Sequence, residues 1–465
     1  MMSAFRGVGA RSAAWWRAAG LTLFVAAGFT QTASAQGTDL DPRIVTLVAS
    51  IREDRLVALL KKLESFETRN TLSSATSTAR GIGAARQWIL DEMRSYSPKL
   101  QVSFDTYQVA KQDRITRDVE LRNVMAVLPG RTPRRIYISG HYDTVAAPGG
   151  QIGAAAAGTA LVPPAAAAAP LDNPAPGVND DGSGTALTME LARVFSQSGV
   201  EFDATLVFMC HAGEEQGLVG ALLHAQKAVA ENIPIQAILN NDIVGGDTGG
   251  SGIVDGATIK VYSQGPEDSP SRALARFVQR WGARYVPSHK VRPMARPDRF
   301  GRGGDHSAYN HHGFAAVGFR EARENFSRQH DVRDTFAGIL PAYLVQNARV
   351  NAAAAATLAL APPPPSVLGE RNQPLITRAP SGYDANLTWQ ASPGAVAYRI
   401  FWREAWGPDW QHEMLVGNVT NVVLQNMQID DYVFGVAAVD AQGHESYATA
   451  YVAPPRANPV IRTLP

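Results

Sequence analysis

The sequence predicts an α/β fold followed by a separate C-terminal β-sandwich. Residues 205–210, T-L-V-F-M-C, form a short apolar run of strand formers that Gly213 stops, which is typical of a central strand buried on both faces. A proline run at residues 362–365 indicates a stiff linker, after which the composition changes. The chain is 45% hydrophobic and 18% charged, as expected of a globular protein.

The first 35 residues resemble a secretory signal. Arginines precede an apolar core at residues 18–29, and Ala33-Ser34-Ala35 has the small side chains of a cleavage site. We therefore expect a mature chain that begins near Gln36, is secreted or periplasmic, and has no membrane span. An uncleaved anchor is the alternative, although the apolar core is short for a bilayer.

Net charge and cysteine content exclude some classes of protein. The formal charge of +1 includes Arg6, Arg11 and Arg17 of the leader, so the mature chain carries about −2 by the same count. With no basic stripe elsewhere, we expect no nucleic-acid partner. Cys210, the one cysteine, cannot form an internal disulfide. A small buried hydrophobe is the main interpretation of Cys210, and a nucleophile the alternative.

The elements follow in order along the chain. Apolar spacing predicts helices over residues 41–63 and 82–96, separated by a polar loop at 68–78. Strands are expected at 102–110, 119–128, 135–141, 205–210, 235–241 and 314–319, and a helical run at 186–195. Residues 146–177, dominated by Ala, Pro and Gly, predict a mobile loop that either covers a site or is an inert insertion.

Two strand ends carry groups suited to chemistry. Glu214 and Glu215 follow the strand at 205–210, on the rim where open α/β sheets bind ligands. Two adjacent carboxylates are unfavourable unless a cation or a raised pKa relieves them. His141 ends another strand, and Asp143 shares its face two residues later, as a carboxylate that orients a metal-bound histidine does.

Three further segments bring oxygen and nitrogen ligands. Residues 177–185, G-V-N-D-D-G-S-G-T, place Asp180 and Asp181 in a tight turn, for which an Asx turn capping the next helix is the simpler interpretation. Asp242 ends the strand at 235–241, and His330 lies in a later loop. His, Asp and Glu at four separate strand ends or loops form a ligand set suited to zinc.

In this order, H-Y-D, N-D-D-G-S-G, G-E-E-Q-G, N-D-I-V-G and the later His resemble the di-zinc aminopeptidase family of secreted exopeptidases, over roughly residues 68–340. The resemblance implies a mixed, mostly parallel central sheet flanked by helices. It also implies two zinc ions per chain, one held by His141 and Asp242, the other by Glu215 and His330, and both bridged by Asp180.

The resemblance also implies roles for residues that do not bind zinc. Glu214 would be the general base, Asp143 would orient His141, and Asp181 would follow a cis peptide bond. An unligated carboxylate next to a metal-activated water can take its proton, which agrees with adjacent glutamates having separate roles.

Two features depart from the family pattern. Ser327-Arg328-Gln329 precede His330, where relatives usually have a tyrosine or cysteine, so His306, His311 and His312 are rival ligands. Asp305-His306 resembles a substrate-side pair in some relatives, although a polar loop explains it equally well. The second departure is the loop at 146–177, which would limit access by large substrates.

The C-terminal segment reads as short strands at 385–389, 397–402, 413–416, 421–424, 432–439 and 448–452. Trp389, Tyr398 and Tyr432 stand as in fibronectin type III domains, which the segment resembles. Trp402, Trp406 and Trp410 either pack internally or form a face that binds peptide or polysaccharide.

These observations predict four segments: a signal peptide (1–35), a zinc peptidase domain (36–361), a proline linker (362–366) and a fibronectin type III-like domain (367–465). The expected function is zinc-dependent exopeptidase action on peptides, with an aminopeptidase favoured. A carboxypeptidase or glutaminyl cyclase on the same scaffold is the first alternative. A non-catalytic peptide- or polysaccharide-binding protein is the second, but it predicts a lost ligand, and every ligand position is filled.

Overall fold

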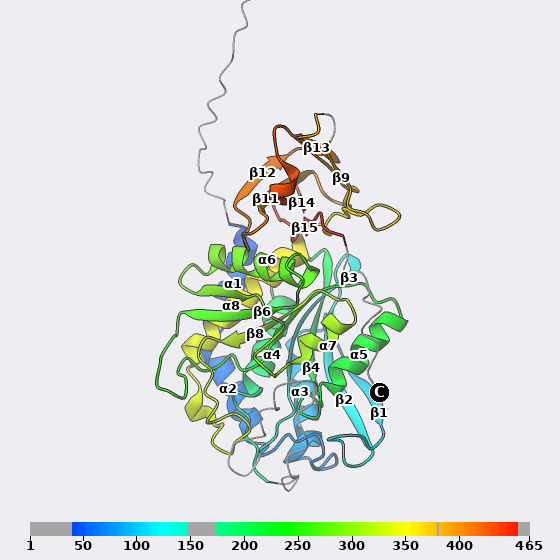
Figure 1. Ribbon diagram of the computed structural model, residues 1–465. Helices are drawn as coiled ribbons and strands as arrows, with labels where there is room; N and C mark the ends of the chain where they lie inside the picture. The colour runs from blue at the N-terminus through cyan, green and yellow to red at the C-terminus, as the bar shows by residue number, and fades with distance from the viewer. Residues whose placement is uncertain (1–39, 147–172, 379–380, 454–465) are drawn as a thin grey trace, which may run out of the picture. The chain divides into compact units, whose positions relative to one another are not determined.

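A computed structural model describes residues 40–146, 173–378 and 381–453. The expected signal peptide and most of the expected loop at 146–177 lie outside these residues. The helices that precede the C-terminal sheets are α1 (Pro42–Ala49), α2 (Glu53–Glu64), α3 (Gly81–Tyr96), α4 (Gly182–Gln197), α5 (Val219–Ala230), α6 (Pro270–Tyr285), α7 (Asp305–His311) and α8 (Pro341–Leu360) (Figure 1). No helix of the described residues is long and apolar enough for a membrane span.

A central eight-stranded sheet organises this part of the chain. Its strands lie in the order β1 (Gln101–Val109), β2 (Val119–Leu128), β4 (Ala204–His211), β3 (Thr132–His141), β5 (Ile235–Asn241), β8 (Ala316–Glu321), β6 (Thr258–Ser263) and β7 (Lys290–Met294). The inner strands β4, β3, β5 and β8 run parallel, whereas β1 and β2 are antiparallel additions at one edge. The predicted mixed, mostly parallel sheet is confirmed.

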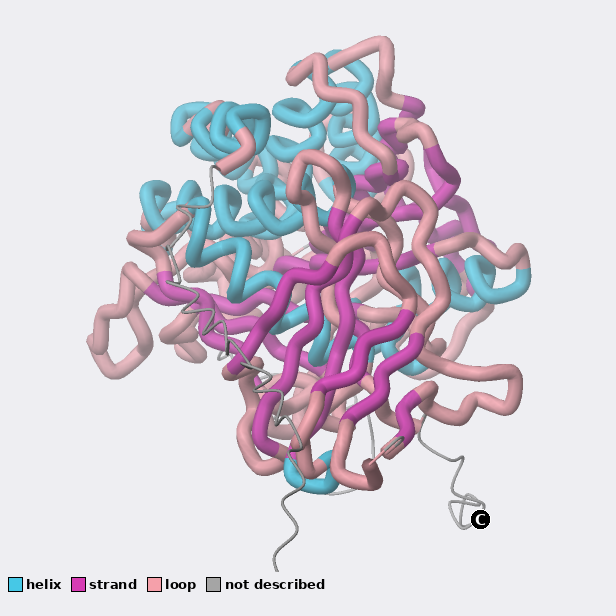
Figure 2. Tube along the Cα trace, turned by 90° about the horizontal axis from the view of Figure 1, so that it is seen from above, coloured by secondary structure: helices cyan, strands magenta, loops and turns pink. Residues whose placement is uncertain are grey.

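Helices cover both faces of the sheet. Helices α4 and α8 pack on β3 and β4, with α1 and α2 against them, while α5 and α7 lie over the opposite face (Figure 1). Figure 2 shows helices on more than one side of the strands. Every residue of β4 is buried, which explains its uninterrupted apolar sequence.

The prediction of a single helix over residues 41–63 is wrong, because the helix is interrupted between α1 and α2. Ser50 ends α1, and its backbone N–H and hydroxyl group both donate to the carbonyl of Thr46. Arg52 is extended, and its N–H donates to Glu190 of α4 at 3.0 Å. The apolar pattern continues across the break because Ile51 is buried too.

Some of the expected boundaries also change. The polar loop considered for Asp305-His306 is instead the start of α7, and Lys290–Met294, where no strand was expected, form the edge strand β7. In β7 only Val291 is buried and Pro293 interrupts the strand, so no run of strand formers marks it.

The C-terminal part has two antiparallel sheets. One has the order β13 (Asn421–Leu424), β10 (Ala385–Thr388), β9 (Ile376–Thr377), and the other β12 (His412–Val416), β11 (Ala397–Glu404), β14 (Tyr432–Val439), β15 (Thr449–Ala450). Leu387, Trp389, Ile400 and Val436 from both sheets share one core, which confirms the predicted sandwich.

The three tryptophans do not form one exposed face. Trp410 packs against Phe401, and the guanidinium groups of Arg276 and Arg403 lie 5.6 and 5.7 Å from the centre of its ring. Trp402 stacks on His412, and of the three only Trp406 is largely exposed. Trp410 is therefore better explained by internal packing than by ligand binding. Beside it, Arg403 forms an ion pair with Asp268, which precedes α6.

Candidate metal centre

Three neighbouring parallel strands carry the first ligands to one edge of the sheet. His141 is the last residue of β3, Glu214 and Glu215 follow β4, and Asp242 follows β5. Because β4, β3 and β5 are adjacent and parallel, their carboxyl ends meet at this edge. Asp180 comes from the turn before α4, and His330 comes from the loop after β8, where its backbone φ is +53°.

The five predicted ligands form two clusters that share one carboxylate. His141, Asp180 and Asp242 form the first, and Asp180, Glu215 and His330 form the second. Asp180 Oδ1 lies 3.3 Å from His141 Nε2, while Asp180 Oδ2 lies 3.1 Å from His330 Nε2. The two oxygens of Asp180 thus face different histidines.

The donor atoms of these clusters fit metal ions. His141 Nε2 and Glu215 Oε1 are buried and have no hydrogen-bond partner. Buried polar atoms without partners are costly, and a bound cation would satisfy both. Two imidazoles and three carboxylates in sets of three are also the donors that zinc takes.

The charge distribution leads to the same inference. Burial alone would lower the pKa of His330, but Glu215 and Asp180 raise it to about 10. Burial opposes the shift at His141 as well, where Glu214, Asp143 and Asp180 raise the pKa well above its usual range. Both histidines are therefore surrounded by excess negative charge, which a metal cation would neutralise.

The turn that carries Asp180 is fixed by backbone contacts. The Asp180-Asp181 peptide bond is cis, as the family resemblance implies. Asp181 caps α4 by accepting from the N–H of Gly184 at 2.8 Å, and its other oxygen accepts from the N–H of His141 at 3.0 Å. Asp334 accepts from the N–H groups of Asn179 and Asp180 at 3.0 and 2.9 Å.

Asp143 was expected to orient His141 through its side chain, but it contacts the histidine through its main chain. His141 Nδ1 bonds to the backbone carbonyl of Asp143 at 3.0 Å, while the nearest carboxylate oxygen is 3.7 Å away. The carboxylate instead accepts from the N–H groups of Glu214 and Glu215, both at 3.2 Å, and from the hydroxyl of Thr71. Its side chain therefore orients the two glutamates, and its main chain orients the histidine.

Glu214 lies beside the clusters without belonging to either. Its Oε2 is 3.9 Å from His141 Nε2. Burial and the like charges of Asp242 and Glu215 raise the pKa of Glu214 well above its usual range, against the lowering effect of His141. A raised pKa favours accepting a proton, as general-base action requires.

Sequence reasoning missed three buried residues that support the ligands: Arg69, Arg320 and Asp334. Arg320, on β8, pairs with Asp242 Oδ1 at 2.5 Å and donates to the Asp242 carbonyl at 3.1 Å. Arg69 donates to the carbonyls of Tyr142 and Gly177, at 2.7 and 2.8 Å. No local motif marks these residues, because each contacts a segment more than 70 residues away.

The rival ligands lie outside both clusters. His306 Nε2 bonds to the carbonyl of Pro297 at 2.8 Å, and His311 and His312 lie at the end of α7. Neighbouring Asp305 is fully buried, and neither of its carboxylate oxygens has a hydrogen-bond partner. Cys210 is buried within β4, and burial raises the pKa of its thiol, which opposes the nucleophile interpretation.

An open α/β sheet whose strand ends carry two carboxylate-histidine clusters defines a metal-dependent enzyme. The model of peptidase family M28 matches residues 123–355, and the chain belongs to this family. A probable zinc metalloprotease of Pyricularia oryzae is 35% identical over 457 residues, covering 90% of this chain and 85% of its own. One from Pyrenophora tritici-repentis is 33% identical over 445 residues, covering 88% and 86%. The chain is therefore a zinc metallopeptidase that acts on peptides.

Solved structures share the fold at low sequence identity. The Legionella pneumophila LapA aminopeptidase superposes with a TM-score of 0.51 at 19% identity, covering 70% of this chain and 76% of its own. The Porphyromonas gingivalis glutaminyl cyclase does so with a TM-score of 0.51 at 16% identity, covering 66% and 98%. At these identities the likeness concerns the fold alone.

Proposed function

We propose that the protein is a di-zinc aminopeptidase that removes N-terminal residues from peptides. The observation that carries this proposal is that both clusters share the carboxylate of Asp180. One of its oxygens faces His141 in the first cluster, and the other faces His330 in the second. One carboxylate shared between two ligand sets suits a pair of metal ions. Asp242 completes the first set and Glu215 the second.

The residues around the clusters have separate roles in this proposal. Zinc, when bound, polarises the scissile carbonyl and lowers the pKa of water. Glu214 takes a proton from the attacking water and delivers it to the leaving amine. Asp143 positions Glu214 and Glu215 through their backbone N–H groups. Arg320 orients Asp242 by pairing with its carboxylate.

A glutaminyl cyclase is the alternative on this scaffold, since one of the structural relatives has that activity by name. Cyclisation needs one metal ion, so two complete ligand clusters favour hydrolysis. A carboxypeptidase would instead require a free C-terminus in its substrate. A carboxypeptidase therefore differs from an aminopeptidase in the end of the peptide that must be free, whereas a glutaminyl cyclase also needs a free N-terminus and differs in its product.

One assay separates these activities. The purified chain is given the same peptide with both ends free, with the amine acetylated, and with the carboxylate amidated. We expect cleavage of the free and amidated peptides and none of the acetylated one. Equal cleavage of the acetylated peptide would refute the aminopeptidase assignment, and formation of pyroglutamate from an N-terminal glutamine would favour the cyclase.

We also propose that residues 1–35 are a cleaved signal and that the protein is secreted or periplasmic. The small-residue site at Ala33-Ser34-Ala35 supports this proposal. We assign residues 36–361 to the peptidase domain, 362–366 to a linker and 367–465 to a fibronectin type III-like domain, supported by the two antiparallel C-terminal sheets. N-terminal sequencing of the exported protein tests the cleavage site, with Gln36 as the expected first residue.

A further inference from the structure

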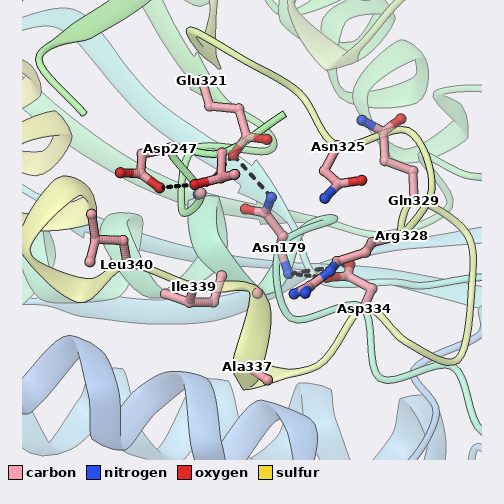
Figure 3. Close-up of a pocket in the computed structure, with 13 residues that line it drawn as sticks. Asn179, Asp247, Glu321, Asn325, Arg328, Gln329, Asp334, Ala337, Ile339 and Leu340 are labelled. Atoms are coloured by element: carbon pink, nitrogen blue, oxygen red, sulfur yellow. Dashed lines mark hydrogen bonds between the residues drawn. The ribbon is translucent and has the colours of Figure 1, made fainter. Parts of the chain in front are cut away.

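A cavity of about 330 Å³ lies beside the turn that carries Asp180, on residues that the catalytic proposal does not use (Figure 3). None of the five predicted zinc ligands lines it. Its wall comes from Asn179, the turn that follows Asp242, the end of β8 with the loop after it, and the segment between His330 and α8. Its volume is in the range of pockets that take small organic groups.

Glu321, the last residue of β8, supplies a buried carboxyl group to this cavity. Its Oε2 accepts from the N–H of Gly246 at 2.7 Å and from Asn179 Nδ2 at 3.0 Å. Its Oε1 has no hydrogen-bond partner, although the residue is only 1% exposed. Figure 3 shows Oε1 pointing away from Asn179, toward the side where Asn325 lies.

No ion pair neutralises the carboxyl group of Glu321 among the described residues. Burial together with Glu324 and Asp334 raises its pKa well above its usual range. Arg328, the cationic residue of the cavity wall, lies beside Asp334 and apart from Glu321 in Figure 3. A cationic ligand would satisfy Oε1 and stabilise its ionised form.

The rest of the wall indicates what kind of cation fits. Asp247 and Asn325 add polar groups, whereas Ala337, Ile339 and Leu340 make an apolar side. Glu321 belongs to no cluster of three metal-ligating side chains in the described residues, so a bare metal ion would have too few ligands. A positive tip on an apolar stem matches both sides of the cavity.

We propose that this cavity binds an alkylammonium group, that is, a primary amine on a short apolar chain such as the end of a lysine side chain. The ammonium donates to Glu321 Oε1, and the methylene groups pack on Ile339 and Leu340. Asn179 joins Glu321 to the neighbouring Asp180, so the site is one residue from the metal centre. The proposal concerns binding and does not depend on peptidase activity.

Calorimetry with the zinc-loaded protein tests this proposal, using n-butylamine as the probe and 1-butanol as its neutral counterpart. We expect n-butylamine to bind and 1-butanol to show no measurable binding. Glu321→Gln keeps an oxygen for Gly246 and Asn179 but replaces the free oxygen with an N–H₂ group. It should weaken n-butylamine binding by about tenfold or more, because the lost contact is a charge-assisted hydrogen bond.

Two further variants keep the test decisive. Glu231→Gln removes an exposed carboxylate just after α5 and should bind n-butylamine like the wild type. Ala337→Phe fills the cavity while leaving Glu321 intact and should also abolish n-butylamine binding. It serves as the test if Glu321→Gln does not fold. Equal binding to all variants would place the amine elsewhere, such as on zinc, and overturn the proposal. The proposal would also be overturned if 1-butanol bound as well as n-butylamine, if only Ca²⁺ bound at the cavity, or if the wild type did not bind n-butylamine.

Discussion

At the scale of single residues, Asp143 explains how the adjacent Glu214 and Glu215 can have the separate roles that we propose. The carboxylate of Asp143 accepts one backbone N–H from each glutamate, and these two bonds fix the turn after β4. Glu215 then points into the cluster with His330, where its Oε2 lies 3.2 Å from His330 Nε2. Glu214 lies beside His141 instead, with its Oε2 3.9 Å from His141 Nε2. The position of a third carboxylate, rather than any difference between the two glutamates, separates ligand from base.

Asp143→Ala should therefore lower kcat by about 10- to 100-fold, as loss of groups that support metal ligands commonly does. Thr71→Val, which removes only the hydroxyl donor to the same carboxylate, is the matched control and should have a smaller effect. Steady-state kinetics with a free-amine peptide, beside zinc analysis, provides the measurement. Wild-type kcat in Asp143→Ala would show that the Asp143 side chain does not position the glutamates.

At the scale of elements, the inner strands could be predicted because each is an apolar run that ends in a polar motif. The end of β3 at His141 and the burial of β4 follow directly from such runs. The edge strand β7 could not, since its side chains are half exposed and it contains Pro293. The break between α1 and α2 depends on a contact with Glu190 of α4, which the local apolar pattern cannot reveal.

The candidate site divides in the same way. The five residues of the two clusters could be predicted from motifs and a family resemblance, because each motif lies in one short segment. The residues that hold those segments could not, because Arg320, Asp334 and Arg69 act across long sequence separations. The backbone contact between Asp143 and His141 could not be predicted either, since H-x-D spacing suggests a side-chain contact.

Arg69 is the clearest test at this scale, because it joins the segment after β3 to the turn before α4. Its buried guanidinium group donates to four carbonyl oxygens, those of Leu63, Tyr142, Pro176 and Gly177. Arg69→Met would leave these acceptors without partners and should lower the free energy of unfolding by about 3 kcal/mol or more.

Urea denaturation of the zinc-loaded protein measures this loss. Arg131→Met is the control, because Arg131 has a largely exposed side chain, and such substitutions usually change stability by less than about 0.5 kcal/mol. If both variants unfold at the same urea concentration, Arg69 does not stabilise the turn that carries Asp180.

At the scale of the whole described chain, one histidine joins its first and last parts. His444, in the C-terminal part, lies 2.6 Å from both Asp41, which caps α1, and Asp440. Arg43 Nη2 is 3.3 Å from the same ring, and Tyr285 accepts from the Asp41 N–H. Burial alone would lower the pKa of His444, but Asp440 and Asp41 raise it.

A raised pKa in the folded state stabilises the fold most below the unfolded pKa of about 6.5, and the contribution disappears as pH rises through the folded value. His444→Gln should therefore cost about 1–2 kcal/mol at pH near 6. The difference from wild type should shrink in alkaline solution. Urea denaturation of both proteins across this range checks the sign, and a difference that stays constant with pH would contradict it.

The central claim is that Asp180 serves two zinc ions while Glu214 binds neither. Elemental mass spectrometry of the purified chain and of Glu214→Gln, beside peptide turnover, tests it most directly. We predict two zinc ions per chain in both proteins, with kcat of Glu214→Gln lower by about 10²- to 10⁴-fold. A single zinc ion in the wild type, or a Glu214→Gln variant that holds both ions and retains full activity, would contradict the account.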